Sequence, residues 1–142
     1  MKTPGRCLLS LIVLCLAACD KVYEAHVSVT LPSDAAKNAE NVATDLVSHL
    51  DSRFDLRCGP PRTCDTSTPS SPCVPELRRY CNPRHASTSI QIVTTGSELT
   101  VDISQISGSK EPETFRALRL ATEEHLRQSV PEAMVSVEYP VR

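Results

Sequence analysis

The segment Tyr23 to Leu31, with the sequence YEAHVSVTL, decides the fold of this chain because it alternates apolar and polar residues without a break. Its odd-numbered positions are Tyr23, Ala25, Val27, Val29 and Leu31, and its even-numbered positions are Glu24, His26, Ser28 and Thr30. Successive side chains of a strand point to opposite faces of a sheet. The segment is therefore predicted to be a strand with one buried face and one hydrated face.

The segments that follow show the periodicity of one helix and then of a hairpin. Pro32 and Ser33 mark a turn, and Ser33 is the expected N-cap of a helix whose apolar stripe runs from Ala35 to Leu50 and extends to Phe54. The remaining expected elements are a hairpin of strands over 89–93 and 99–103, a helix between Gly108 and Pro131, and a strand over 134–139.

The order of these elements is β-α-β-β-α-β, with a cysteine-rich segment between the first helix and the second strand. That order is the ferredoxin-like arrangement. Each strand has only one strongly apolar face, so we expect an α+β fold in which an antiparallel sheet carries both helices on one side. Many unrelated activities use this arrangement, so it does not indicate a function.

Residues 55–86 differ from the rest of the chain in composition. Proline, serine and threonine replace periodic apolar residues there, so we expect a loop without regular structure apart from a helical turn at Pro75 to Tyr80. A segment of this length without secondary structure is unusual in a compact domain, so we expect another interaction to hold its shape. The segment contains four cysteines, Cys58, Cys64, Cys73 and Cys81.

These four cysteines are predicted to form two disulfides that staple the loop. Three pairings are possible, and the sequence does not rank them. Zinc is the alternative, but the spacing C-x5-C-x8-C-x7-C contains no C-x2-C pair of the kind used by structural zinc sites. We therefore expect neither a metal nor another cofactor.

The N-terminal residues have the organisation of an export signal. Lys2 and Arg6 precede an apolar run over 8–16, which is shorter than the roughly 20 residues needed to span a bilayer. The run ends in the tetrapeptide Leu16-Ala17-Ala18-Cys19, which resembles the lipobox of bacterial lipoprotein precursors. An ordinary signal peptide followed by an incidental cysteine is the alternative interpretation.

The resemblance implies that residues 1–18 are a lipoprotein signal peptide and that Cys19 becomes the acylated first residue. Residues 19–142 would then form a single periplasmic domain held on the lipid bilayer. Asp20 resembles the inner-membrane retention signal of enteric-type lipoproteins, although an outer-membrane location stays open. Export also agrees with the expected disulfides, which form in oxidising compartments.

Charge is distributed unevenly along the predicted mature chain. Cleavage before Cys19 removes two basic and no acidic residues, which leaves 13 Lys and Arg against 17 Asp and Glu. Residues 53–85 nevertheless contain six arginines and only three carboxylates. The candidate partner-binding residues in this segment are Arg62, Arg78, Arg79 and Arg84. They either dock on an acidic partner or on anionic headgroups, or they neutralise the acidic remainder of the domain.

The expected open face of the sheet is polar. It should carry His26, Ser28, Thr30, Gln91, Thr100, Asp102, Ser136 and Glu138. RNA-binding domains of this topology stack bases on exposed aromatic side chains, which we do not expect on this face, so nucleic acid is not an expected ligand. His26, Asp102 and Glu138 could meet there as a weak metal or acid–base cluster, but solvated surface is the favoured interpretation.

His125 falls on the apolar stripe of the second expected helix, where a partly buried histidine bonded to a carbonyl is the favoured interpretation. The chain contains no G-x-S-x-G or H-E-x-x-H motif and no glycine-rich phosphate loop, so we do not expect an enzyme.

The sequence favours a non-catalytic envelope lipoprotein that binds another envelope protein with an acidic surface, as an accessory or assembly subunit of an envelope or secretion complex. The alternative is a periplasmic immunity or exclusion lipoprotein that inhibits a toxin or hydrolase. Nothing in the sequence sets an oligomeric state.

Overall fold

The computed structural model describes residues 20–34, 38–63, 76–108 and 110–139 of the 142-residue chain. The elements, in chain order, are β1 (Lys21–Thr30), α2 (Ala39–Phe54), β2 (Leu56–Cys58), β3 (Arg62–Thr63), β4 (Glu76–Pro83), β5 (Ser89–Thr95), β6 (Glu98–Ser107), α3 (Glu113–Ser129) and β7 (Met134–Glu138).

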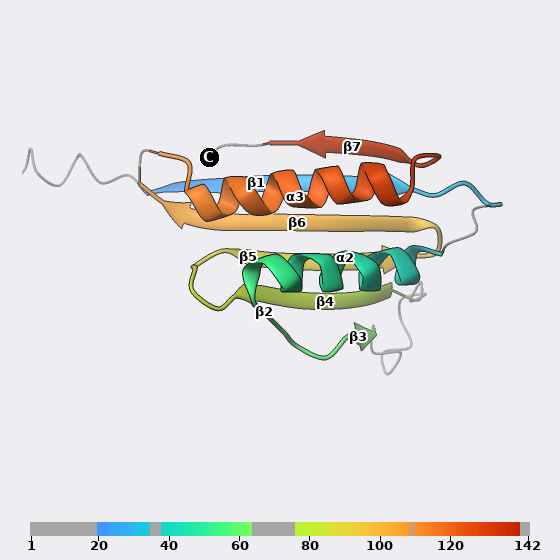
Figure 1. Cartoon of the computed structure of the whole chain (residues 1–142), viewed down its shortest axis with the longest axis horizontal. Coiled ribbons are helices and arrows are strands. Elements are labelled where there is room, and N and C mark those ends of the chain that lie inside the picture. The colour runs from blue at the N-terminus through green and yellow to red at the C-terminus, as the bar shows by residue number, and fades with distance from the viewer. Residues whose placement is uncertain (1–19, 35–37, 64–75, 109, 140–142) are drawn as a thin grey trace, which may run out of the picture.

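One antiparallel sheet forms the base of the domain, and both helices cover the same face of it (Figure 1). The strands follow the order β2-β4-β5-β6-β1-β7, with β3 also paired to β4. α2 packs on β5 and β6, whereas α3 packs on β1, β6 and β7. The predicted α+β class, with two helices on one side of an antiparallel sheet, is therefore confirmed.

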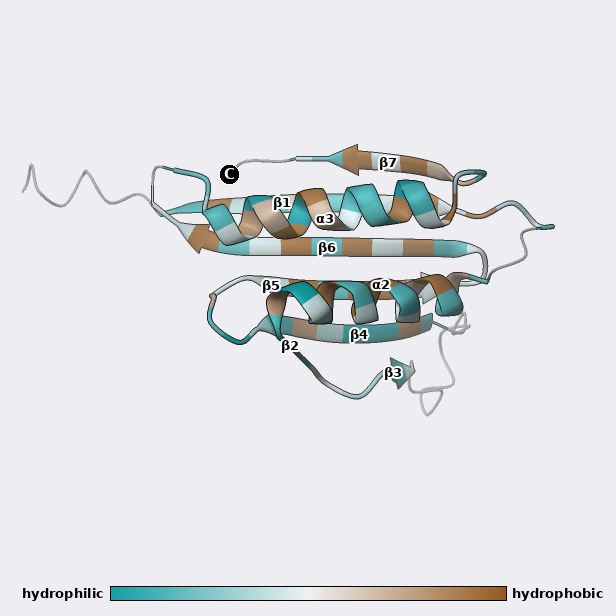
Figure 2. Ribbon diagram, in the orientation of Figure 1, coloured by the Kyte–Doolittle hydropathy of each residue, from teal (hydrophilic) through white to brown (hydrophobic). Residues whose placement is uncertain are grey.

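The alternation that predicted the first strand is present in β1, which lies inside the sheet. Val27 and Val29 are 0 % and 1 % exposed beneath the helices, while His26 and Ser28 lie on the other face and are half-buried. β1 pairs with β6 along its whole length and with β7 from His26 onward. Figure 2 shows a similar alternation of apolar and polar residues along β6.

The side chains that the sheet and helices enclose are mainly aliphatic, because the sequence supplies few aromatic residues. The largest fully buried side chains include Leu46, Leu50, Ile90, Ile92, Leu99, Ile103, Leu118 and Leu126. One aromatic pair closes the core, where the ring centroids of Tyr23 and Phe115 lie 6.1 Å apart.

α2 begins later than the sequence predicted. Its N-cap is Asn38 rather than Ser33, and the Asn38 Oδ1 atom accepts a hydrogen bond of 2.8 Å from the backbone N–H of Asn41. Asparagine caps helices at least as well as serine, so the cap adjacent to the first buried residue, Ala39, is used. The helix ends at Asp55, which adopts the left-handed conformation with φ 49° and donates its N–H to Asp51 O.

The cysteine-rich segment contains more regular structure than we predicted. β2, β3 and β4 all lie within 55–86. Most of the stretch predicted as a helical turn, Pro75 to Tyr80, instead belongs to the strand Glu76–Pro83. β4 pairs with β5 from Glu76 to Cys81. The sequence analysis missed this strand because it interpreted the composition of 55–86 as that of a loop, whereas pairing with β5 stabilises the strand.

The second half of the chain agrees closely with the sequence prediction. β5 and β6 form the expected hairpin, and Gly96 adopts φ 59° in the two-residue turn between them. Glycine suits this left-handed conformation because it has no Cβ. α3 follows Pro112 and ends at Ser129, and β7 adds the last strand at one edge of the sheet.

Candidate functional site

The face of the sheet away from the helices, called the open face below, carries two polar groups that could contact other molecules. The residue register defines this face, because directly opposed residues on neighbouring strands project to the same side. One row across it consists of Tyr80, Gln91, Asp102, His26 and Glu138. The adjacent row consists of Arg62, Arg78, Val93, Thr100, Ser28 and Ser136.

Arg62 and Arg78 lie directly opposite each other on β3 and β4, where they form what we call the arginine edge of the open face. Two of the four predicted partner-binding arginines are thus brought together. Arg57 of β2 is exposed on the same face, opposite Asn82. The cationic groups cluster here because β2, β3 and β4 each place one arginine on this face.

The two members of the arginine edge differ in their partners. Arg78 is 43 % exposed, and its Nε donates a hydrogen bond of 2.8 Å to Glu76 Oε1, while its Nη2 contacts the same oxygen. Interaction with the Tyr80 hydroxyl, followed by that with Glu76, raises the pKa of Arg78 above its usual range. Among the described residues, no carboxylate pairs with Arg62, which is exposed. Toward the described part of the chain, Arg62 therefore keeps its donors available for an external acid.

Arg79 and Arg84 do not belong to this edge. Arg79 points to the helix side of β4, because adjacent residues in a strand face opposite ways, and there it lines a small hollow with Glu40 and Thr44. Arg84 follows β4 and pairs with Asp55 at 3.0 Å. The pair Arg78-Arg79, which is the densest point of charge in the sequence, is thus divided between two faces of the sheet.

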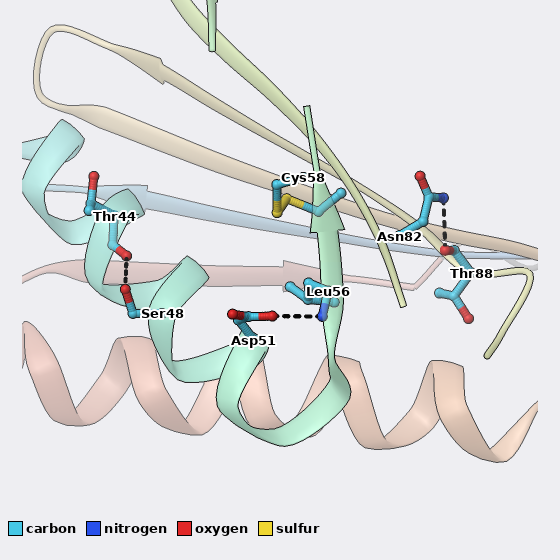
Figure 3. Close-up of a disulfide and its surroundings, with 8 residues drawn as sticks. Thr44, Ser48, Asp51, Leu56, Cys58, Asn82 and Thr88 are labelled. Atoms are coloured by element: carbon cyan, nitrogen blue, oxygen red, sulfur yellow. Dashed lines mark hydrogen bonds between the residues drawn. A yellow bond between two sulfur atoms is a disulfide. The ribbon is translucent and has the colours of Figure 1, made fainter. Parts of the chain in front are cut away.

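A disulfide between Cys58 and Cys81 joins β2 to β4, the strand that carries Arg78 of the arginine edge (Figure 3). The two residues are direct partners in the ladder between β2 and β4, with Cα atoms 4.1 Å apart. This is one of the three pairings that the sequence left open. The other two predicted disulfide residues, Cys64 and Cys73, lie outside the described residues, as does the predicted lipidation residue Cys19.

Backbone contacts reinforce the disulfide on both sides. Gly59 N donates to Tyr80 O at 2.9 Å, and Leu56 N donates to Asp51 Oδ1 at 2.8 Å, which ties β2 to the end of α2 (Figure 3). Asn82 Nδ2 likewise donates to Thr88 O at 3.1 Å. The arginine edge is therefore attached to a covalently and hydrogen-bonded framework rather than to a loop without structure.

The second polar group centres on His26, as the sequence suggested. His26 Nδ1 lies 2.5 Å from Asp102 Oδ1, and His26 Nε2 lies 3.1 Å from Ser28 Oγ. The pair borders a shallow hollow of about 440 Å³ that is also lined by Glu24, Gln91, Ser104 and Glu138. The register places His26 opposite both Asp102 and Glu138 on adjacent strands, an arrangement that the sequence allowed although solvated surface was the favoured interpretation.

The contacts Ser28–His26–Asp102 follow the nucleophile–base–carboxylate order of some hydrolases. Both His26 and Asp102 are 44 % exposed on a flat face. From His26 to Thr30, β1 pairs on both edges, which engages the backbone N–H groups that could otherwise stabilise an oxyanion. Within the described residues, moreover, no group of three or more His, Cys, Asp or Glu side chains is arranged to hold a metal ion.

His125 has a different environment from the one we predicted. Its Nε2 lies 3.2 Å from Asp45 Oδ2, so its partner is a carboxylate on α2 rather than a carbonyl. Its ring stacks on His49 with centroids 4.2 Å apart. Burial, followed by the nearby His125 and Arg53, lowers the pKa of His49 below its ordinary value of 6.5. This cluster joins the two helices on the side opposite the open face.

The sequence analysis missed one residue of the open face. Tyr80 is 45 % exposed and lies opposite Gln91, so the expectation that this face carries no aromatic side chain was wrong. Tyr80 was missed because 55–86 was predicted to be a loop, and a loop has no assigned face. The sequence did contain an indication of this strand, because apolar residues lie on its other side, at Leu77, Cys81 and Pro83.

No family model, curated protein or solved structure matches this chain. No helix in the described part of the chain has the length and apolar character needed to cross a membrane.

Proposed function

We propose that this chain is a cell-envelope lipoprotein, anchored through Cys19, whose domain binds another envelope protein as an accessory or assembly subunit. The tetrapeptide Leu16-Ala17-Ala18-Cys19 supports the anchor. The start of β1 at Lys21, two residues after that cysteine, also supports it, because processing there would leave the folded domain intact. Asp20 favours retention in the inner membrane, facing the periplasm.

We also propose that the domain is a ferredoxin-like fold with an enlarged edge. In this proposal β1, α2, β5, β6, α3 and β7 form the β-α-β-β-α-β core. The neighbour order β5-β6-β1-β7 among its four strands supports this assignment. β2, β3 and β4 would then be an insertion after the first helix that extends the sheet beyond β5.

The arginine edge is our proposed contact surface, and its position is the observation that carries the proposal. Arg78 lies in the same cross-strand row as Ser28, which is six residues along β1 from Val22. At about 3.3 Å per residue, that row lies about 20 Å from the end of β1 that leads to Cys19. An anchored domain would therefore present Arg62 and Arg78 away from the headgroups, where an acidic protein surface can reach them.

The disulfide makes this edge suited to binding. Cys58 and Cys81 fix β2 against β4, the strand of Arg78, so little backbone entropy is lost when a partner contacts that arginine. Arginine is also enriched among the residues that contribute most to protein interfaces. Arg79 and Arg84, which face elsewhere or are already paired, are not included in this contact.

Charge reversal tests the proposed contact. The variant Arg62→Glu/Arg78→Glu should lose most of the protein captured by crosslinking in intact cells, because both guanidinium groups would repel an acidic surface. The matched control, Arg53→Glu/Arg127→Glu, changes the net charge equally but alters exposed residues of α2 and α3. Equal capture by both variants would refute the arginine edge, provided that their melting temperatures agree.

The anchor is tested separately by metabolic labelling with palmitate. Label should enter the chain and should be lost in Cys19→Ala, which should also leave the membrane fraction. An unlabelled mature chain would refute the lipoprotein proposal without affecting the arginine edge. The identity of the captured protein then separates a complex subunit from an inhibitor, because only an inhibitor should capture a toxin or a hydrolase.

A further inference from the structure

One end of the sheet combines the start of the domain with an exposed apolar side chain. β1 begins there at Lys21 and β6 ends there at Ser107, and the two residues are direct partners in the ladder. The turn after β4 and the start of α3 lie at the same end, on the left in Figure 1. Leu56 and Pro83, where β2 begins and β4 ends, are buried, whereas one apolar side chain at this end is exposed.

That residue is Ile106, which is 66 % exposed on the open face. It is opposed by Val22, which is half-buried, so the two form a small apolar patch. The alternation of β6 places Leu99, Val101 and Ile103 in the core, and Ile106 falls outside that series. The domain core therefore gives no reason for an isoleucine at this position.

The patch is mounted on a rigid part of the domain. Tyr23, next to Val22, is 7 % exposed, packs on Phe115, and donates its hydroxyl to Gly108 O at 3.4 Å. Val22 and Ile106 themselves lie in a continuous ladder of paired residues. A surface that contacts this patch would therefore hold the whole sheet in one orientation.

The charges around the patch are of both signs. Lys21 and Lys110 are exposed cations at this end of the sheet. Of the nearby carboxylates, Glu111 is engaged by Arg116 at 2.8 Å and by Arg119 at 3.5 Å. Asp20, Glu24 and Glu113 also lie near this end, so apolar contact rather than net charge is the attraction to be expected.

We infer that this end of the sheet is a second membrane contact, in which Ile106 and Val22 enter the boundary between headgroups and acyl chains. The inference rests on the proposed acylation of Cys19. Only Asp20 separates that cysteine from Lys21, and the two backbone steps between them reach at most about 7 Å. An anchored domain would be held with this end against the bilayer, where a large exposed apolar side chain is stabilised.

This contact sets the orientation of the domain. The strands would stand away from the bilayer, with the β1–β6 end at its surface and the β5–β6 turn at Gly96 farthest from it. Ile106 and the lipid anchor together would prevent the domain from tumbling about a single tether. The arginine edge would then be presented at a fixed height and direction instead of sampling all orientations.

The chain contains no tryptophan, so a single introduced tryptophan can report contact with lipid. The test variant is Ile106→Trp, and the control is Met134→Trp. Met134 is 76 % exposed on the same open face, but it is opposed by Thr30, eight residues and about 26 Å along β1 from Val22. Both variants exchange an exposed apolar residue, so a general affinity of tryptophan for lipid affects them equally.

The full-length acylated chain, purified from membranes, is reconstituted into vesicles of phosphatidylethanolamine and phosphatidylglycerol with or without brominated acyl chains. Bromine quenches tryptophan that enters the bilayer boundary. The fluorescence of Ile106→Trp should fall roughly twofold in brominated vesicles, while that of Met134→Trp should be unchanged. Hydrogen exchange of the unsubstituted chain should also show slower exchange at Val22 and Ile106 on vesicles than in detergent.

Equal quenching of the two variants, or none, in a chain that still floats with the vesicles would overturn the second contact and leave the anchor intact. Unchanged exchange at Val22 and Ile106 would overturn it independently of any substitution. A chain that does not float with vesicles would refute the lipid anchor itself, and the inference with it. The two failures are thus distinguished by flotation.

Discussion

The β1–β6 centre of the sheet and the β2–β4 edge are built by different means. β1 is paired on both sides and buries a regular series of aliphatic residues, such as Val27 and Val29. β2 and β3 are short, and a disulfide joins β2 to β4. The centre is therefore specified by apolar periodicity, and the edge by covalent and ladder constraints. Because these constraints hold the edge in place, its exposed side can carry arginines.

The largest expected difference between these regions lies in their response to loss of apolar volume. Leu99 of β6 is 0 % exposed, and Leu99→Ala should lower the free energy of unfolding by about 2–5 kcal/mol because it leaves a cavity in the core. Leu77 of β4 is only half-buried, and Leu77→Ala should cost less than about 1 kcal/mol. Urea denaturation measures both values. Equal losses would remove the distinction between centre and edge.

Removal of the disulfide tests the same comparison at the edge of the sheet. Cys58→Ala/Cys81→Ala should lower the free energy of unfolding by about 2–4 kcal/mol, because the cross-link restricts the unfolded chain. Faster amide exchange should be concentrated in β2 and β4, while Val27 should open only with the whole domain. Hydrogen exchange with mass spectrometry resolves the two segments. A uniform increase across both would show that the edge is not locally dependent on the cross-link.

The smallest effect concerns the contact between α2 and α3, which joins the two regions above the sheet. The pKa of His49 is lowered in the folded domain, so the unfolded chain binds the proton more readily. The stability contributed by neutral His49 is complete above about pH 6.5 and is lost as the pH falls below that value. The groups that face this ring are Asp45 and Arg53 on α2, and Glu124 and His125 on α3.

The melting temperature should therefore fall by a few degrees at most between pH 7.5 and pH 5.5. His49→Gln should reduce that slope, because glutamine does not titrate. Thermal melts followed by circular dichroism measure the change. A slope that His49→Gln leaves intact would assign the pH dependence to other groups.

Most of the centre could be predicted from the sequence. The period-two patterns of β1, β5, β6 and β7 and the helical stripe of α2 predicted these elements. The same patterns placed His26 and Asp102 on the open face, where the structure shows them directly opposed. The cap of α2 was misplaced because both Ser33 and Asn38 are good capping residues. The interpretation of His125 failed in one respect, since its partner Asp45 lies on another helix.

The edge could not be predicted in the same way. Composition described 55–86 as a loop, and Arg79 interrupts the series Leu77, Cys81 and Pro83 on the helix side of Glu76–Pro83. Without that strand, Arg78 and Arg79 looked like one cationic group, and Tyr80 had no assigned face. The pairing of Cys58 with Cys81 was equally hidden, because it depends on which strand lies beside β2.

The sequence by itself determined the α+β class, the buried faces of the central strands, and the polar character of the open face. Those properties follow from side-chain period, which each strand or helix expresses locally. Only the tertiary structure decided which cysteine pairs with Cys58, which arginines share a surface, and where they lie relative to the start of β1. These properties depend on which strands become neighbours, because pairing and register arise from contacts between residues far apart in the chain.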